Sequence, residues 1–194
     1  FPSLPPASST AVVREAMWFG IYGATLAWLQ IGRVLTLALG ALLHDLGMMP
    51  WAQETFHQTT PLTDQDWEKI KTHPDRGAKL LEPLELPEEV LLIIRQHHES
   101  ANGSGYPLAL KGDEIHPWAK ILRILDSYEA MTSLRPWRPP ISERQALRIM
   151  TSAWSAQGNY DLDYLKPFFA FIGGKKGDEE GHPPSSARLI EIPA

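Results

Sequence analysis

The segment GRVLTLALGALLHDLG, residues 32–47, is an apolar run that ends in an adjacent histidine and aspartate. It lacks the apolar–polar alternation of a half-buried strand, and its length suits a buried helix. The sequence therefore predicts two helices, over residues 11–29 and 32–46, both apolar on most sides. Gly47 is a typical helix stop, and Pro50 then disfavours resumption of the helix.

Helix-start signals recur along the rest of the chain, and no strand-like alternation competes with them. Thr63 followed by Asp66 has the spacing of a helix-capping pair. Proline is favoured in the first turn of a helix, so several prolines indicate where helices begin or break. The predicted positions are a break near Pro74, starts at Pro87 and Pro117, and helices over 141–154 and 161–171.

These signals predict an all-α fold, a single helical bundle of about seven helices. Residues 1–10 are rich in proline and serine and are expected to be a linker. Residues 11–171 are expected to form one domain. Residues 172–194 are rich in glycine, proline and charge, so a flexible C-terminal tail is expected there.

Composition excludes several classes of protein. The 194 residues have 18 Lys and Arg against 23 Asp and Glu, and this net charge of -5 argues against a DNA-binding protein. The chain has no cysteine, which rules out a disulfide framework and a thiolate metal site. A chain without cysteine also fits a reducing compartment, and a cytoplasmic location is expected.

The least polar stretch is AMWFGIYGATLAWLQIG, residues 16–32, which has 17 residues and no charge. A membrane-spanning helix needs about 20 apolar residues. This stretch is shorter and contains Thr25, Gln30 and several glycines. A buried helix is therefore the better interpretation, and no membrane span is expected in this chain.

Histidines and aspartates at or near predicted helix ends, or inside a predicted helix, are the candidate metal ligands. They are His44, Asp45, His73, His97, His98 and Asp126. Helix bundles build two-metal sites from ligands that project inward from several helices, and imidazole with carboxylate suits iron, manganese, zinc or nickel. A lone histidine on an apolar helix is more often a hydrogen-bonded core residue, so the combination carries the prediction. Asp45 is the candidate bridge between two metals.

Two further segments have residues suited to a phosphate-containing ligand. The loop NGSGYP follows the histidine pair directly, and its Gly105, Tyr106 and Pro107 could shape a pocket for a base. Arg135 and Arg138 in RPWR present planar groups that suit phosphate. A plain turn with a packed tyrosine, and a solvated surface pair of arginines, are the alternatives.

Together these segments resemble the HD-GYP subgroup of the HD-domain metal-dependent phosphohydrolases. The matching segments are HDLG (44–47), PLTDQDWEKIKTHPDRGAKLL (61–81), QHHESANGSGYP (96–107), LKGDEI (110–115) and AKILRILDSYEAMTSLRPWR (119–138). The resemblance covers roughly residues 11–165. It implies an all-helical HD-domain bundle that uses two or three metal ions, often iron or manganese, to hydrolyse cyclic di-GMP, a bacterial second messenger.

The resemblance also implies a role for each candidate residue. One metal would be held by His44, Asp45 and Asp126, and the second by Asp45, His73, His97 and His98. Gly105, Tyr106 and Pro107 would form the signature loop, and Arg135 and Arg138 would contact the substrate phosphate. The implied cofactors are two divalent ions, iron or manganese. The implied partners are cyclic di-GMP and an upstream sensor or receiver module, with a diguanylate cyclase domain as a further candidate.

Two departures from the subgroup bear on activity. Members usually have a histidine on the first helix and a lysine four residues after the histidine of the HD pair. This chain has no histidine before His44, and Met48 occupies the lysine position. The main hypothesis is a metal-dependent phosphodiesterase that converts cyclic di-GMP to the linear dinucleotide or GMP. The alternative is a weak or inactive relative that senses the nucleotide or binds a protein partner. A general nucleotide phosphohydrolase is a third interpretation, which the GYP loop disfavours.

Overall fold

The computed structural model describes residues 31–51, 62–134 and 138–178. The expected helix over 11–29, the expected linker and Arg135 therefore lie outside the described residues. The described elements are α2 (Ile31–Leu43), η1 (Leu46–Trp51), α4 (Asp64–Ile70), α5 (His73–Leu81), η2 (Glu82–Leu84), α6 (Glu88–Gln96), η3 (Gly112–Glu114), α7 (Pro117–Thr132), α8 (Glu143–Gln157) and α9 (Leu162–Asp178).

The all-α prediction is confirmed. The described residues contain α-helices and short 3-10 helices but no strand. Asn102 and Lys111 form an isolated antiparallel bridge, which closes the loop between α6 and α7. That loop includes the GYP triplet, so it is a closed loop with ends held close together.

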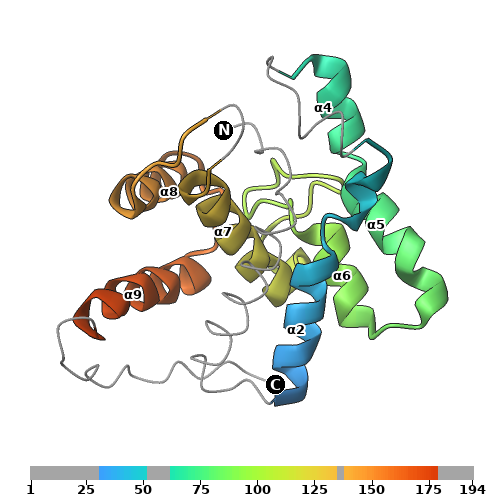
Figure 1. Ribbon diagram of the computed structural model, residues 1–194, viewed down its shortest axis with the longest axis horizontal. Coiled ribbons are helices and arrows are strands. Elements are labelled where there is room, and N and C mark those ends of the chain that lie inside the picture. Colours follow the sequence, from blue (N-terminus) through green and yellow to red (C-terminus); the bar gives the residue numbers. More distant parts are fainter. Residues whose placement is uncertain (1–30, 52–61, 135–137, 179–194) are drawn as a thin grey trace.

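Helix α7 lies between two groups of helices (Figure 1). On one side α6 packs against it, and α2 and α5 pack against α6. On the other side α8 and α9 both contact α7. The N-terminal half of the described chain therefore lies across α7 from the C-terminal half.

The described residues contain two apolar clusters, which do not coincide with these two groups. The larger one joins α7, α8 and α9, includes the fully buried side chain of Phe168, and extends across α7 to Leu37, Ala41 and Ile93 on α2 and α6. The smaller one lies between α5 and α6 and consists of Ala78, Leu81, Val90 and Ile94. The apolar core is therefore concentrated beside α7, away from α5.

The helix-start signals in the sequence act as expected. Thr63 and Asp66 form a reciprocal capping box at the start of α4. Pro74 lies in the first turn of α5, so the proline that ends one helix also opens the next. Pro87 directly precedes α6, and Pro117 is the first residue of α7.

Two predicted boundaries differ from the structure. Helix α2 ends at Leu43, before Gly47, and the 3-10 helix η1 then includes Pro50. Helix α9 continues to Asp178, past residue 171, where the last helix was expected to end. Ile172 is buried in the larger apolar cluster, and its burial favours continuation of the helix beyond that boundary.

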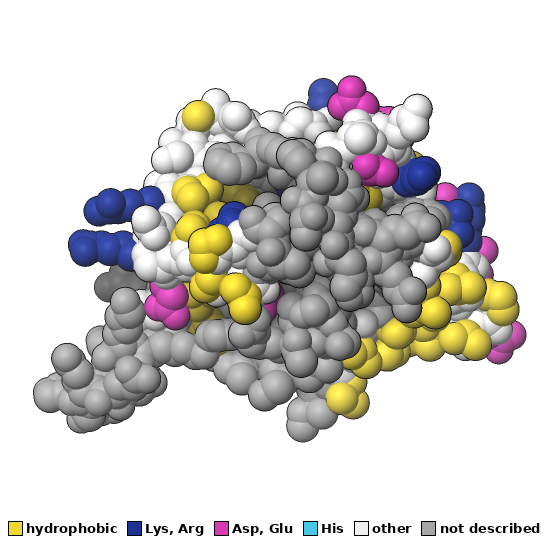
Figure 2. All heavy atoms as spheres, turned by 45° about the horizontal axis from the view of Figure 1, so that its top comes forward, with side chains coloured by type: hydrophobic (Ala, Val, Ile, Leu, Met, Phe, Trp, Pro, Cys, Tyr) yellow, Lys and Arg dark blue, Asp and Glu magenta, His cyan; other side chains and the backbone are white. Residues whose placement is uncertain are grey.

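Hydrophobic side chains are visible on the described surface, gathered mainly at the lower right of Figure 2, on the side where Figure 1 places α5 and α6. Leu80 on α5 and Leu84 on η2 are among the exposed large hydrophobic side chains. Among the described residues, no helix has both the length and the hydropathy needed to cross a membrane.

Candidate metal centre

Three buried histidines are held in the same way by the ends of three helices. The Nδ1 atoms of His44, His73 and His97 lie 2.7, 2.6 and 2.7 Å from the carbonyl oxygen of the residue three positions earlier. Those carbonyls belong to the last turns of α2, α4 and α6. A carbonyl only accepts, so each Nδ1 donates its proton and each Nε2 carries the electron pair that can bind a metal.

The Nε2 atoms converge on the carboxylate of Asp45. One carboxylate oxygen lies 3.2 Å from His73 Nε2 and 3.9 Å from His97 Nε2. The other oxygen lies 3.5 Å from His44 Nε2. The Nε2 atoms of His73 and His97 are themselves only 3.1 Å apart. Two nitrogen electron pairs at this separation need a proton or a cation between them.

Gly47 lets these groups approach. An added Cβ at Gly47 would lie 2.0 Å from the carbonyl oxygen of His73 and 2.7 Å from the backbone nitrogen of Gly77. Both neighbours are backbone atoms, which cannot rotate away. The glycine of the HDLG motif therefore permits the close packing of η1 on α5 that brings Asp45 to His73.

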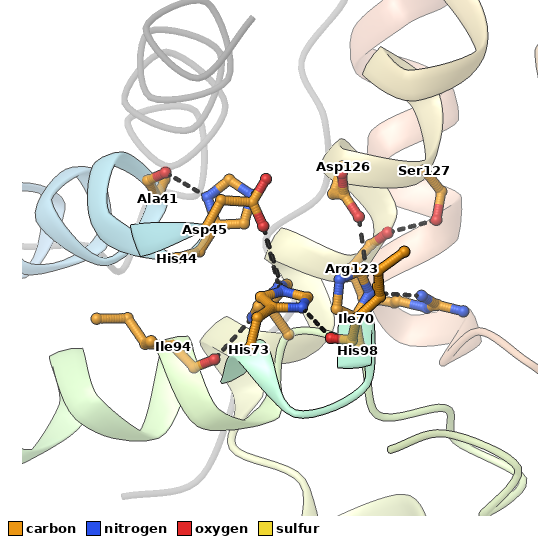
Figure 3. Close-up of polar contacts among 11 residues, drawn as sticks. Ala41, His44, Asp45, Ile70, His73, Ile94, His98, Arg123, Asp126 and Ser127 are labelled. Atoms are coloured by element: carbon orange, nitrogen blue, oxygen red, sulfur yellow. Dashed lines mark hydrogen bonds and ion pairs between the residues drawn. The ribbon is translucent and has the colours of Figure 1, made fainter. Parts of the chain in front are cut away.

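His98 has different surroundings from the other three histidines (Figure 3). Its Nδ1 lies 3.2 Å from a guanidinium nitrogen of Arg123 and 3.9 Å from a carboxylate oxygen of Asp126, both on α7. Its ring stacks on that of Tyr106, with 4.8 Å between centroids and 29° between planes. His98 therefore connects the histidine cluster to α7 and to the GYP loop.

Asp45, His73, His97 and His98 form a compact set of potential metal ligands. One ligand atom from each lies within 4.8 Å of the others. Three imidazoles with a carboxylate are a donor set that suits a divalent transition metal. The ends of α2, α4 and α6 also direct their negative dipole ends toward this set, which favours a cation. The residues present fit such an ion. His44 and Asp126 lie beside the set, in contact with Asp45 and His98 respectively.

Burial and neighbouring charge keep these groups in the protonation states that metal ligands need. Burial alone would raise the pKa of Asp45, but His44, His73 and His97 outweigh it, and the pKa lies well below its ordinary value. Burial also lowers the pKa of His97 and of His98 well below the ordinary range of histidine. The carboxylate is therefore ionised and these imidazoles are neutral at pH 7.

Glu99 shapes the GYP loop from inside the protein. Its two carboxylate oxygens accept the backbone N–H groups of Leu108 at 2.7 Å and Leu110 at 3.0 Å. Burial raises the pKa of this carboxyl group, and the backbone donors partly offset that effect. Gly105 passes so close to the Glu99 backbone that a Cβ there would lie 2.3 Å from the nitrogen of Ser100. The glycine before the tyrosine is therefore needed for the turn.

A cavity of about 430 Å³ opens beside His98. Its inner part is lined by His98, Tyr106 and Arg123, and Trp67 on α4 lines another wall. Gln157 at the end of α8 and Asn159, just after the helix, complete it. A volume of this size suits a small organic ligand, placed next to the candidate metal ligands.

The structure brings together all six predicted ligands but places Arg138 elsewhere. Its guanidinium donates to the carbonyl oxygens of Ala130 at 2.7 Å and Met131 at 3.2 Å, at the C-terminal end of α7. Glu99 and Arg123 were not among the site residues predicted from the sequence. Glu99 directly follows the histidine pair, and Arg123 lies one helical turn before Asp126, so helical spacing could have indicated Arg123.

Comparison with known proteins places this arrangement in a family. The HD domain family model matches residues 3–163. A cyclic di-GMP phosphodiesterase of Pseudomonas aeruginosa is 31% identical over 136 residues, which are 70% of this chain and 32% of the relative. A 3'3'-cGAMP-specific phosphodiesterase of Vibrio cholerae is 28% identical over 137 residues, 71% of this chain and 30% of the relative. The chain spans about a third of the length of these curated relatives.

Solved structures agree on the fold. An HDG"Y"P protein from Bdellovibrio bacteriovorus matches with a TM-score of 0.69 at 22% identity, over 86% of this chain and 52% of the other. The HD domain of the L. monocytogenes phosphodiesterase PgpH, in complex with cyclic-di-AMP, matches with a TM-score of 0.59 at 17% identity, over 91% of this chain and 95% of the other. With its HDLG pair, its histidine cluster and its GYP loop, the chain belongs to the HD domain family and to the HD-GYP subgroup within it.

Proposed function

We propose that this chain is a metal-dependent phosphodiesterase that hydrolyses cyclic di-GMP to the linear dinucleotide or GMP in bacterial second-messenger signalling. The observation that carries the proposal is the position of four potential ligands within 4.8 Å of one another, beside a cavity of about 430 Å³. The names of the curated relatives, which are phosphodiesterases for cyclic dinucleotides, support the same reaction.

The proposed cofactors are two divalent ions, iron or manganese. His44, Asp45 and Asp126 would hold one, and Asp45, His73, His97 and His98 would hold the other. Bound there, the ions would supply Lewis-acid activation of water and of the phosphoryl group. Asp45 suits the shared position because its two carboxylate oxygens face different imidazoles.

The chain's own residues would orient the substrate. Gly105, Tyr106 and Pro107 line or flank the cavity wall next to His98, so the loop would limit where a guanine base can lie. Arg135 and Arg138 are proposed to contact substrate phosphate. For Arg138 to do so, its guanidinium must either break its hydrogen bonds to the carbonyls at the end of α7 or contact the phosphate with its remaining N–H groups.

A weak or inactive relative that senses the nucleotide is the second candidate. Two sequence features favour it, because the chain lacks a histidine before His44 and has Met48 where members usually have lysine. Met48 is buried, so it brings no charge to the substrate. A cytoplasmic location, an upstream sensor or receiver module and a diguanylate cyclase partner belong to the same proposal.

Turnover of cyclic di-GMP, measured together with metal content, separates the two candidates. Protein purified without chelator or nickel resin is expected to contain about two metal ions per chain by mass spectrometry and to form product. One ion or none, with binding but no product, would identify a sensor. Cyclic-di-AMP and 3'3'-cGAMP are the comparison substrates.

Substitution tests the ligand assignment. His73→Ala and Asp45→Ala are each expected to remove metal and to abolish turnover. His116→Asn is the matched control, because His116 lies outside the cluster and caps the start of α7. Unchanged metal content in His73→Ala or Asp45→Ala would show that the ligand assignment is wrong.

A further inference from the structure

Arg123 occupies a position that no predicted role explains. It lies on α7, one turn before Asp126, and lines the inner cavity with His98 and Tyr106. One of its guanidinium nitrogens lies 3.2 Å from His98 Nδ1. A guanidinium only donates, so this contact is a hydrogen bond only when His98 Nδ1 carries no proton. A metal held by Nε2 would leave the proton on Nδ1, and all five N–H groups of Arg123 would then be available to a ligand.

No carboxylate forms an ion pair with Arg123 within 4.0 Å in the described part of the chain, and its buried Nε has no hydrogen-bond partner among those residues. The nearest influence of this kind is the buried carboxyl of Glu99, whose pKa the guanidinium lowers without direct contact. Lys120, on the same helix, offers the contrast. It is buried and pairs with Asp161 at 2.8 Å. A partly buried cation without a close partner is costly, and an anion in the cavity would reduce that cost.

Other charged residues of the cavity do not meet this need. Asp64, Glu68 and Lys71 line its α4 wall, and all three are exposed. Lys71 already pairs with Glu68 at 2.8 Å. The inner end of the cavity, next to His98, therefore receives its positive charge from Arg123.

We infer that Arg123 binds a phosphate group of the dinucleotide and orients it beside the histidine cluster. The inference rests on the proposed function and adds to it a residue that recognises the substrate. Arg123 would supply from α7 the positive charge that Met48 does not supply from η1. Its planar donor array suits two phosphate oxygens at once. Because phosphate is common to all cyclic dinucleotides, Arg123 contributes affinity and does not select the base.

Binding of a substrate analogue tests the inference without relying on turnover. Metal-loaded wild type, Arg123→Gln, Arg123→Lys and Arg148→Gln are titrated with phosphorothioate analogues of cyclic di-GMP and cyclic-di-AMP, which resist hydrolysis. Arg148 is the matched control because it is an exposed arginine on α8, outside the cavity. Metal content and thermal unfolding are measured for every variant.

Arg123→Gln is expected to weaken binding of both analogues by a similar factor, about ten- to hundred-fold, which is typical for loss of hydrogen bonds to a charged group. Arg123→Lys, which keeps the charge but loses the planar array, should lose less. Arg148→Gln should bind as wild type does. All four proteins are expected to contain the same amount of metal.

Three other results would overturn the inference about Arg123, and the last of them would overturn the proposed function as well. Binding by Arg123→Gln within two-fold of wild type, with full metal content, overturns the inference and leaves the proposed function standing. Loss of metal in Arg123→Gln means that Arg123 supports His98 and does not bind phosphate. If wild type binds neither analogue, the proposed function fails, and the inference fails with it.

Discussion

The two sides of α7 differ in the side chains that they bury. On the side of α8 and α9, the large apolar cluster includes the fully buried Phe168. On the side of α2, α5 and α6, the same cluster continues through residues such as Leu37, but buried polar groups lie there as well, among them His44, His73 and His97. Gly47 also approaches the backbone of α5 closely on that side. We therefore expect substitutions on the first side to affect stability, and substitutions on the second side to affect the candidate metal site as well.

Phe168→Ala tests the apolar side and should have the largest effect on stability. The ring is 0% exposed and packs edge-on against Tyr128 with 5.2 Å between centroids. Its removal should lower the free energy of unfolding by about 3–5 kcal/mol, measured by urea denaturation. Metal bound per folded chain should not change. Loss of metal at normal stability would contradict the division between the two sides.

Gly47→Ala tests the side of the histidines. The added methyl group meets the His73 carbonyl at 2.0 Å, so η1 and α5 must separate. We expect a loss of about 3 kcal/mol, the upper end for over-packing, and loss of most of the bound metal by mass spectrometry. Gly173→Ala is the control, because a Cβ there has nothing within 4 Å. If Gly47→Ala retained its full metal content, the close packing of η1 on α5 would not be what positions Asp45.

Glu99→Gln tests whether the loop can be altered separately from the ligands. The amide presents an NH₂ group to a backbone N–H, so the loop loses one of two hydrogen bonds at a cost of about 1–3 kcal/mol. Binding of the dinucleotide analogue should weaken while metal content is retained. Glu114→Gln, an exposed carboxylate that accepts from Lys111, should behave as wild type. If Glu99→Gln and Glu114→Gln bound the dinucleotide analogue equally well, the shape of the loop would not determine the affinity.

His116→Asn, at the start of α7, should have the smallest effect on stability. It tests a residue that lies outside both the large apolar cluster and the candidate metal site. Burial lowers the pKa of His116 below its ordinary 6.5, and its neutral ring accepts the N–H of Trp118. The unfolded chain therefore gains the proton first as pH falls. The contribution of His116 to stability is full above about pH 6.5 and is lost below it.

Asparagine keeps the capping acceptor but does not titrate. The difference in unfolding free energy between pH 7.5 and pH 5.5 should therefore be smaller in His116→Asn than in wild type, by about 1 kcal/mol or less. Urea denaturation at the two pH values measures it. Identical pH dependence in the two proteins would assign the acid sensitivity to other groups.

Local signals predicted much of the fold from sequence. The Thr63 capping box and the helix starts at Pro87 and Pro117 depend on residues within one turn, so the sequence pattern was sufficient. The end of α2 and the length of α9 were predicted wrongly. Gly47 stops no helix but permits contact with α5, and α9 continues past residue 171 where Ile172 packs in the core. Both depend on residues distant in sequence.

The candidate site shows the same limit. The ligand types and their places at helix ends or, for Asp126, inside a helix were visible in the sequence. The structure brings Asp45, His73, His97 and His98 close together, with His44 and Asp126 beside them. Their role as ligands stays a prediction. The charge balance around Arg123 was not visible, because the absence of a carboxylate beside a side chain is a property of packing. For the same reason the contacts of Arg138 with the end of α7 could not be predicted.

The three carbonyl contacts of His44, His73 and His97 bear on how the protein would acquire its ions. Each imidazole is oriented by its own helix or by the one before it, so the coordination geometry is prepared by folding. The chain should then differ from domains such as zinc fingers, which fold only when metal binds. A chelator would be expected to empty it reversibly without denaturation. The ion it holds would then be set by which metals are available and by the intrinsic order of affinities among divalent metals.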